Sequence, residues 1–500
     1  MNEIVFENAK NGSLTCSFEG KFLHSKYNPV KEAEIFAENI EFPKNPSFIL
    51  ITEPCISYIV QKIKKKFPEA KLAAIRYSHN FDSFNSGFDC VIYATNENQA
   101  KNLSEKISSE LITKIGEKNL LCSAFLQWLP AANAFPEING KVWNGIKSAV
   151  EYSRASLFTN SYFSKRWFLN SIKNLVFTEN FYKLNKTNLP VVVAASGRSL
   201  ENCLPFLKDE RSNFFLICVS SATAVLLENK IIPDFVISTD GGFWAKKHLE
   251  ALKNFPEIPI ALAIEAACPA FLLKKNPIII LEYCDGFSKK LLDNMNLQFA
   301  PAERNGTVSG TAVSLALKLT EKNIYVCGLD LHSAKGFQHT MPNALEIFNA
   351  KNDNKISGSE LRAVKSEFNS GSLKIYENWF SDGNRNFFGR VFRLSQNFPF
   401  RNNLNTIKDV NLDFFRKTET KTEKKAEKIK KINIEKKYFL EKIRNFIEEK
   451  SKSEEWTEEF FSAETFALKN KNSDNDREQI REEICIKNKK FIKKIKNLIK

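Results

Sequence analysis

Six short apolar segments, separated by stretches long enough for a helix, constrain the fold of this chain most strongly. They lie at residues 189–195, 214–219, 235–238, 258–263, 278–281 and 324–327. Runs of Val, Ile, Leu and Ala without polar alternation are typical of strands buried on both faces, and their repeated strand–helix spacing predicts a doubly wound, mostly parallel sheet. Ligands bind such sheets beyond the carboxyl ends of the strands, so the residues after each segment are candidate ligand-binding residues.

Three further regions flank this predicted sheet. Short apolar runs such as 48–52 alternate with helix-like stretches and predict a smaller N-terminal α/β domain over 1–140. Residues 141–185 are expected to form a helical connector, because large apolar side chains recur there at near-helical spacing. The central Rossmann-like domain is then 186–410. Residues 411–500, rich in Lys, Glu and Ile, predict a basic helical C-terminal region.

The chain has the features of a cytoplasmic protein. Its first ten residues include Glu3 and Glu7 and do not resemble a signal peptide, and no run of about 18 uncharged apolar residues occurs. The ten cysteines form no CxxC pair. This pattern favours reduced thiols over disulfides or a zinc site.

The first two strand ends offer backbone N–H groups and hydroxyls. Gly197 and Ser199 follow the 189–195 strand where a tight turn meets a predicted helix, and such a turn can bind phosphate or carboxylate. A plain strand-to-helix turn is the alternative, since neither GxGxxG nor a GK[S/T] loop occurs. Ser220 follows the next strand.

The third strand ends at Asp240, followed by two glycines that let a carboxylate approach a ribose hydroxyl, a metal or a nucleophile, although Asp-Gly is also a common turn. Residues 305–312 combine small hydroxyl residues and glycines before an apolar helix, which predicts a second anion-binding turn. The 324–327 strand leads to Asp330, which is a candidate ligand-binding residue but could equally cap its loop. His339 follows in the same loop and is a candidate acid or base. Four strand ends on one edge of one sheet together predict a nucleotide-type pocket.

Four segments also resemble a known family in sequence order: 193–200, 232–240, 306–317 and 324–331. They are similar to the central domain of the motility-associated-factor (Maf) flagellin glycosyltransferases. Residues 20–33 and 166–175 resemble the same family, so the resemblance covers roughly 1–410. The family core is related to bacterial sialyltransferases, which use a CMP-activated nonulosonic acid, and to an archaeal pterin pyrophosphokinase that uses Mg-ATP.

The resemblance implies roles for individual residues. The implied nucleotide-sugar-binding residues are Ser196, Gly197 and Ser199 by the phosphate and ribose, Ser220 facing the nucleotide or sugar, Ser309, Gly310 and Thr311 at the sugar carboxylate or phosphate, and Asp330. Asp240 would face the nucleotide or sugar, and either it or His339, the nearest counterpart of the sialyltransferase histidine, would be the catalytic base. No metal and no cofactor beyond the CMP-sugar co-substrate is implied.

The expected function is therefore transfer of a pseudaminic, legionaminic or sialic-type nonulosonic acid from a CMP donor to Ser or Thr of flagellin, its protein partner. Two alternatives stay open: a Mg-ATP-dependent pyrophosphokinase of the pterin type, and a non-catalytic flagellar assembly or binding protein. The sequence sets no oligomeric state.

The formal net charge of +15 would suit a nucleic-acid or anionic-membrane partner. Its densest lysines lie at 421–437 and 487–500, where a solvated helix face is the favoured interpretation and acceptor docking the alternative. Because anionic donors at the strand ends account for the remaining basic balance, we expect neither nucleic acid nor membrane as a partner.

Overall fold

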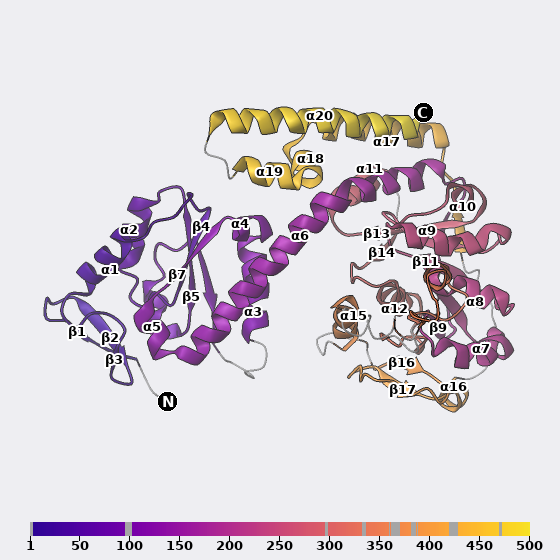
Figure 1. Ribbon diagram of the computed structural model, residues 1–500, viewed down its shortest axis with the longest axis horizontal. Coiled ribbons are helices and arrows are strands. Elements are labelled where there is room, and N and C mark those ends of the chain that lie inside the picture. The colour runs from indigo at the N-terminus through magenta and orange to yellow at the C-terminus, as the bar shows by residue number, and fades with distance from the viewer. Residues whose placement is uncertain are drawn as a thin grey trace. The chain divides into compact units, whose positions relative to one another are not determined.

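The computed structural model describes residues 4–95, 103–295, 299–332, 337–359, 361, 371–381, 387, 389–419, 429–469 and 473–500. Residues 421–428 of the lysine-rich stretch 421–437 thus lie outside the described residues. The chain forms two compact units (Figure 1). Unit 1 is Met1–Phe163 with Phe460–Ile486, and unit 2 is Ser164–Glu459 with Lys487–Lys500.

Unit 1 contains a small parallel sheet in the strand order β6-β5-β4-β7. Its central strand β4 is buried along its whole length, as the uninterrupted run FILIT predicts. An antiparallel sheet β1-β2-β3, which the sequence analysis did not predict, precedes it. The elements are β1 Val5–Asn8, β2 Leu14–Phe18, β3 Lys21–Phe22, α1 Pro29–Glu38, β4 Phe48–Thr52, α2 Ile59–Lys66, β5 Lys71–Arg76, β6 Cys90–Tyr93, α3 Leu103–Ile115, α4 Glu117–Leu121, β7 Ser123–Gln127 and α5 Leu129–Ala134.

One long helix, α6 (Pro136–Phe177), supplies residues to both units. Pro136 occupies its first turn, where the missing N–H costs nothing, and no later proline interrupts it. The predicted helical connector is therefore a single helix up to Phe177. It is followed by strand β8, Phe181–Leu184.

Unit 2 is built on an eleven-stranded sheet. Its order is β17-β16-β15-β9-β10-β11-β12-β13-β8-β18, with β14 beside β13, and every pair is parallel except β8 with β18. The strands are β9 Val191–Ala194, β10 Phe215–Val219, β11 Phe235–Ser238, β12 Ile260–Ala263, β13 Ile278–Tyr283, β14 Ala300–Ala302, β15 Ile324–Cys327, β16 Val391–Leu394, β17 Lys408–Val410 and β18 Ile429–Ile432. The predicted α/β class with a doubly wound sheet is confirmed.

The direction of winding reverses at β9. From β9 the chain adds β10 to β13 on one side, and then β15, β16 and β17 on the other. The carboxyl ends of β9 and β15 consequently lie side by side, joined by the bond from Ala195 N to Cys327 O at 2.8 Å. This is the topological switch point, where sheets of this type bind their ligands.

Helices follow or separate the strands of this sheet, and the last four form the C-terminal region, of which Phe460–Ile486 belongs to unit 1. Helix α12 packs against β9, β10, β11 and β15, and so sits under the switch point. The helices are α7 Leu200–Asp209, α8 Thr223–Glu228, α9 Phe243–Leu249, α10 Ala270–Lys275, α11 Gly286–Asn294, α12 Val308–Leu319, α13 Ala344–Ala350, α15 Gly371–Ser381, α16 Leu412–Thr418, α17 Lys436–Lys450, α18 Glu454–Phe460, α19 Ser462–Lys469 and α20 Asp474–Ile499. Within the described part of the chain, no helix is both long and apolar enough to span a bilayer.

Candidate active site

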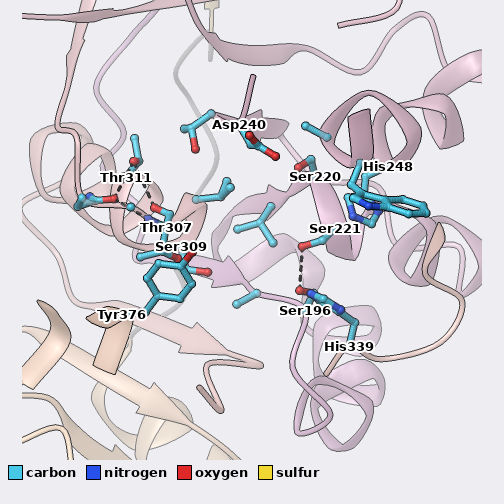
Figure 2. Close-up of a pocket in the computed structure, with 18 of the residues that line it drawn as sticks. Ser196, Ser220, Ser221, Asp240, His248, Thr307, Ser309, Thr311, His339 and Tyr376 are labelled. Atoms are coloured by element: carbon cyan, nitrogen blue, oxygen red, sulfur yellow. Dashed lines mark hydrogen bonds between the residues drawn. The ribbon is translucent and has the colours of Figure 1, made fainter. Parts of the chain in front are cut away.

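A cavity of about 740 Å³ opens at the switch point of unit 2 (Figure 2). Its walls are the residues that follow β9, β10, β11 and β15, together with the first turn of α12. Eight of the ten predicted site residues line it: Ser196, Gly197, Ser220, Asp240, Ser309, Thr311, Asp330 and His339. The volume falls in the range of small-molecule sites.

Ser199 lies behind the cavity wall and is bonded to Asp330. Its backbone N–H donates to Asp330 Oδ2 at 2.9 Å, and its hydroxyl donates to Asp330 Oδ1. Both residues are buried, with exposed fractions of 0% and 2%. The Asp330 carboxylate therefore ties the loop after β15 to the loop after β9, which matches the loop-capping alternative.

The hydroxyl groups beside this contact connect three loops. The Ser221 hydroxyl donates to Ser196 Oγ at 2.8 Å. Thr340 donates from its N–H to Ser196 O and from its hydroxyl to Gly197 O, both at 2.7 Å. The wall is thus cross-linked before any ligand enters, as preorganised binding requires.

Asp240 is an exposed carboxylate in the wall of the cavity. Its Oδ1 accepts the Gly242 N–H at 3.0 Å, the local bond of an Asp-Gly turn. A Cβ on Gly241 would lie 2.6 Å from the Trp167 ring, so this glycine is explained by the close approach of α6. The Asp240 side chain lines the cavity (Figure 2).

The first turn of α12 forms the facing wall. Ser309 lines the cavity next to Thr307, while the Thr311 hydroxyl bonds back to Glu303 O at 3.3 Å. Gly310 points into the protein, because a Cβ there would meet Trp379 and Asn305 at 3.0 Å. The positive end of the α12 dipole therefore faces the cavity, which favours an anionic group there.

Two histidines occupy another part of the wall. His339 is partly exposed and contacts Glu346 through Nδ1 at 3.3 Å. His248, on α9, has its ring centroid 6.4 Å from that of His339. Burial, followed by the nearby His339, lowers the pKa of His248 to about 4, so His248 is neutral at pH 7.

An ion-pair cluster that the sequence analysis missed completes the cavity. Arg304 makes two bonds to the Glu265 carboxylate, at 2.9 and 3.0 Å, and a third to Asp285 at 2.9 Å. Its guanidinium lies 4.0 Å from the Tyr283 ring centroid. Burial raises the pKa of Tyr283 to about 12, which keeps its hydroxyl protonated.

The missed residues differ in whether the sequence carried a signal for them. His248 lies in the helix that follows the predicted Asp240 turn, so inspecting that helix could have found it. Arg304 and Glu265 are 39 positions apart and belong to no motif, and only folding brings them together. Among the described residues, no group of three or more His, Cys, Asp or Glu side chains could hold a metal ion.

Comparisons with known proteins agree with this architecture. Residues 166–336 match the family model described as "6-hydroxymethylpterin diphosphokinase MptE-like". A protein of Treponema pallidum (strain Nichols) is 30% identical over 333 residues, which are 66% of this chain and 73% of the relative. The solved structure of a Maf glycosyltransferase from Magnetospirillum magneticum AMB-1 superposes with a TM-score of 0.55 at 14% identity, covering 100% of this chain and 86% of the other.

These matches first define a class: proteins with an MptE-like domain in a Maf-type fold. The chain belongs to the same family as the Treponema protein, contains an MptE-like domain and has the fold of a Maf glycosyltransferase. The predicted family is therefore confirmed.

Proposed function

We propose that the protein is a glycosyltransferase that moves a nonulosonic acid from a CMP-activated donor to Ser or Thr hydroxyls of flagellin. The main observation in support of this proposal is the cavity at the switch point. It combines a helix N-terminus, strand-end hydroxyls and two candidate bases in one site of about 740 Å³. The fold shared with a Maf glycosyltransferase supports glycosyl transfer in general. The donor and acceptor are inferred from the sequence motifs.

The chemistry would be a direct displacement at the anomeric carbon. The acceptor oxygen forms the new bond, the bond from the anomeric carbon to the phosphate oxygen breaks, and CMP leaves with that electron pair. The proton of the acceptor hydroxyl passes to a base, for which His339 and Asp240 are the candidates. Backbone N–H groups of the first α12 turn would stabilise the charge that develops on the departing phosphate.

A pterin-type pyrophosphokinase is the second candidate, because the matching family model carries that description. The cavity offers the carboxylates of Asp240, Glu265 and Glu303. Glu265 is already paired with Arg304 at 2.9 Å, which favours the first proposal. Diphosphate transfer from Mg-ATP needs carboxylates available for the metal.

Nucleotide binding separates the two candidates. CMP should raise the melting temperature of the purified protein, since a ligand at about 100 times its Kd stabilises by about 2.7 kcal/mol. ATP with Mg²⁺ should leave it unchanged, and the reverse result would favour the pyrophosphokinase. Ser309→Ala should weaken the CMP effect. The matched control Ser212→Ala, at an exposed serine outside the cavity, should not.

The acceptor is tested by intact-mass analysis of flagellin from cells with and without the gene. We expect a mass difference equal to one or more nonulosonic acid residues. The wild-type gene should restore the modified mass of flagellin. The variant that lacks the catalytic base, either His339→Ala or Asp240→Ala, should not restore it. Equal masses in the two strains would overturn the proposal. Restoration by both variants would instead support a non-catalytic assembly role.

A further inference from the structure

The loop that carries His339 is fixed to the cavity wall at two points, both on the C-terminal side of this histidine. Thr340 binds the loop after β9 through two hydrogen bonds, both 2.7 Å long. Three residues further on, the Asn343 side chain donates to Ser221 O at 2.9 Å and caps α13 by accepting the Leu345 N–H at 3.0 Å. This cap places Glu346, in the first turn of α13, directly behind His339.

One oxygen of a buried carboxylate contacts both the backbone of this loop and the ring of His339. Glu346 Oε1 accepts the N–H groups of Gln338 and His339, at 2.8 and 3.1 Å, and lies 3.3 Å from His339 Nδ1. Glu346 is 1% exposed. Although burial opposes ionisation, the hydrogen bonds from the His339 side chain and the Gln338 N–H hold the pKa of Glu346 below its usual value.

We propose that Glu346 is a positioning residue that fixes the ring and tautomer of His339, the base of the transfer reaction. An ionised carboxylate can only accept hydrogen bonds, so the proton of neutral His339 resides on Nδ1. Nε2 then carries the lone pair and is the nitrogen available to an acceptor hydroxyl in the cavity. When Nε2 takes the acceptor proton, the imidazolium that forms lies against the Glu346 carboxylate.

A second histidine lies beside His339. His248 packs on the same wall and is neutral at pH 7, so it does not oppose a proton on His339. Asp240 lies in the same cavity, and its Oδ1 accepts a hydrogen bond from the backbone N–H of Gly242 rather than from a buried side chain. The geometry thus assigns His339 rather than Asp240 as the base, an assignment that rests on the proposed function.

The tautomer can be measured without any activity assay. In full-length protein labelled with ¹⁵N at its five histidines, His339 is assigned by the signal lost in His339→Gln. We expect the Nδ1–H tautomer in the wild type and in Glu257→Gln, a control at an exposed glutamate outside the cavity. Glu346→Gln should give a mixture of tautomers, because an amide can donate as well as accept. An unchanged tautomer in Glu346→Gln would overturn the positioning role.

Transfer kinetics test the catalytic meaning separately. Glu346→Gln should lower kcat roughly 10- to 100-fold with KM for the CMP donor within about 2-fold, while Glu257→Gln matches the wild type. A mixed tautomer with unchanged kcat would overturn the assignment of His339 as base. If the wild type itself shows no transfer, the proposed function fails, whereas the tautomer result still decides whether Glu346 positions His339.

Discussion

At the scale of single residues, close contacts decide what a side chain can do. A Cβ on Gly197 would lie 2.6 Å from both Asp330 Cγ and Gly328 O, so this glycine allows the two loops of the switch point to touch. Gly328 has φ +69°, a conformation that residues with a side chain rarely adopt. The predicted ligand role of Gly197 stays a prediction. The close approach of Asp330 and Gly328 leaves no room for a side chain at this position, whether or not a ligand binds.

His248 predicts a pH dependence of stability. Its pKa is about 4 in the folded protein, below the ordinary 6.5, so the unfolded chain binds more protons between these values. Its contribution to stability is complete above about pH 6.5 and is lost as the pH falls towards 4. We expect the wild type to lose more melting temperature between pH 7 and pH 5 than His248→Gln does. Equal losses in the two proteins would contradict this prediction.

At the scale of elements, the last turns of α6 organise the strand ends. The Asn174 side chain donates to Ile264 O at 2.9 Å and to Ala266 O at 2.8 Å, which holds the loop after β12. Asn170 donates to Glu265 O at 3.0 Å from the preceding turn of the helix. The helix therefore positions the Glu265 carboxylate in the cavity as well as connecting the predicted domains.

Asn174→Ala should destabilise the protein by about 1–3 kcal/mol, because two buried carbonyl groups would lose their donor. The matched control is Lys173→Ala, the exposed neighbour on the same helix, which we expect to change stability by less than about 0.5 kcal/mol. Chemical denaturation of both variants measures the difference. Equal stability of Asn174→Ala and the wild type would show that α6 does not hold this loop.

At the scale of the whole molecule, every residue that lines the cavity belongs to unit 2. Unit 1 has its own parallel sheet, in which β4 and β7 mark a second reversal of winding. At the carboxyl end of its strand β5, Arg76 is 0% exposed and bonds to Glu53, the residue after β4, at 3.0 Å. In unit 1 a buried ion pair thus lies at the carboxyl ends of β4 and β5, whereas in unit 2 the carboxyl ends of the strands open into the cavity.

Hydrogen exchange should therefore separate the two units. With CMP bound, we expect slower amide exchange in peptides covering 195–200, 219–223 and 305–311, and no change in the peptides of β4 and β5. ATP with Mg²⁺ serves as the control nucleotide and should protect neither set. Protection by CMP confined to unit 1 would move the binding site away from the switch point.

Much of the sheet could be predicted because its strands are continuous apolar runs. β11 and β15 have the predicted bounds, and the other four predicted strands shift by one or two residues at their ends. The strands that were missed are short or carry charge, as in β18 with the sequence IKKI, which pairs antiparallel with β8 from far along the chain. Nothing local in such a segment distinguishes a strand from the helices around it.

The sequence by itself determined the parallel sheet, the edge of the sheet that opens into the cavity and eight of the residues that line it, because hydrophobic periodicity and strand-end residues are local properties of the chain. Only the tertiary structure decided which of these residues face the cavity and which support it. Ser199 turned towards Asp330, and Glu346 came to lie behind His339, through contacts between segments that share no motif. Such contacts depend on the packing of whole elements, so the pattern of residues along the sequence does not predict them.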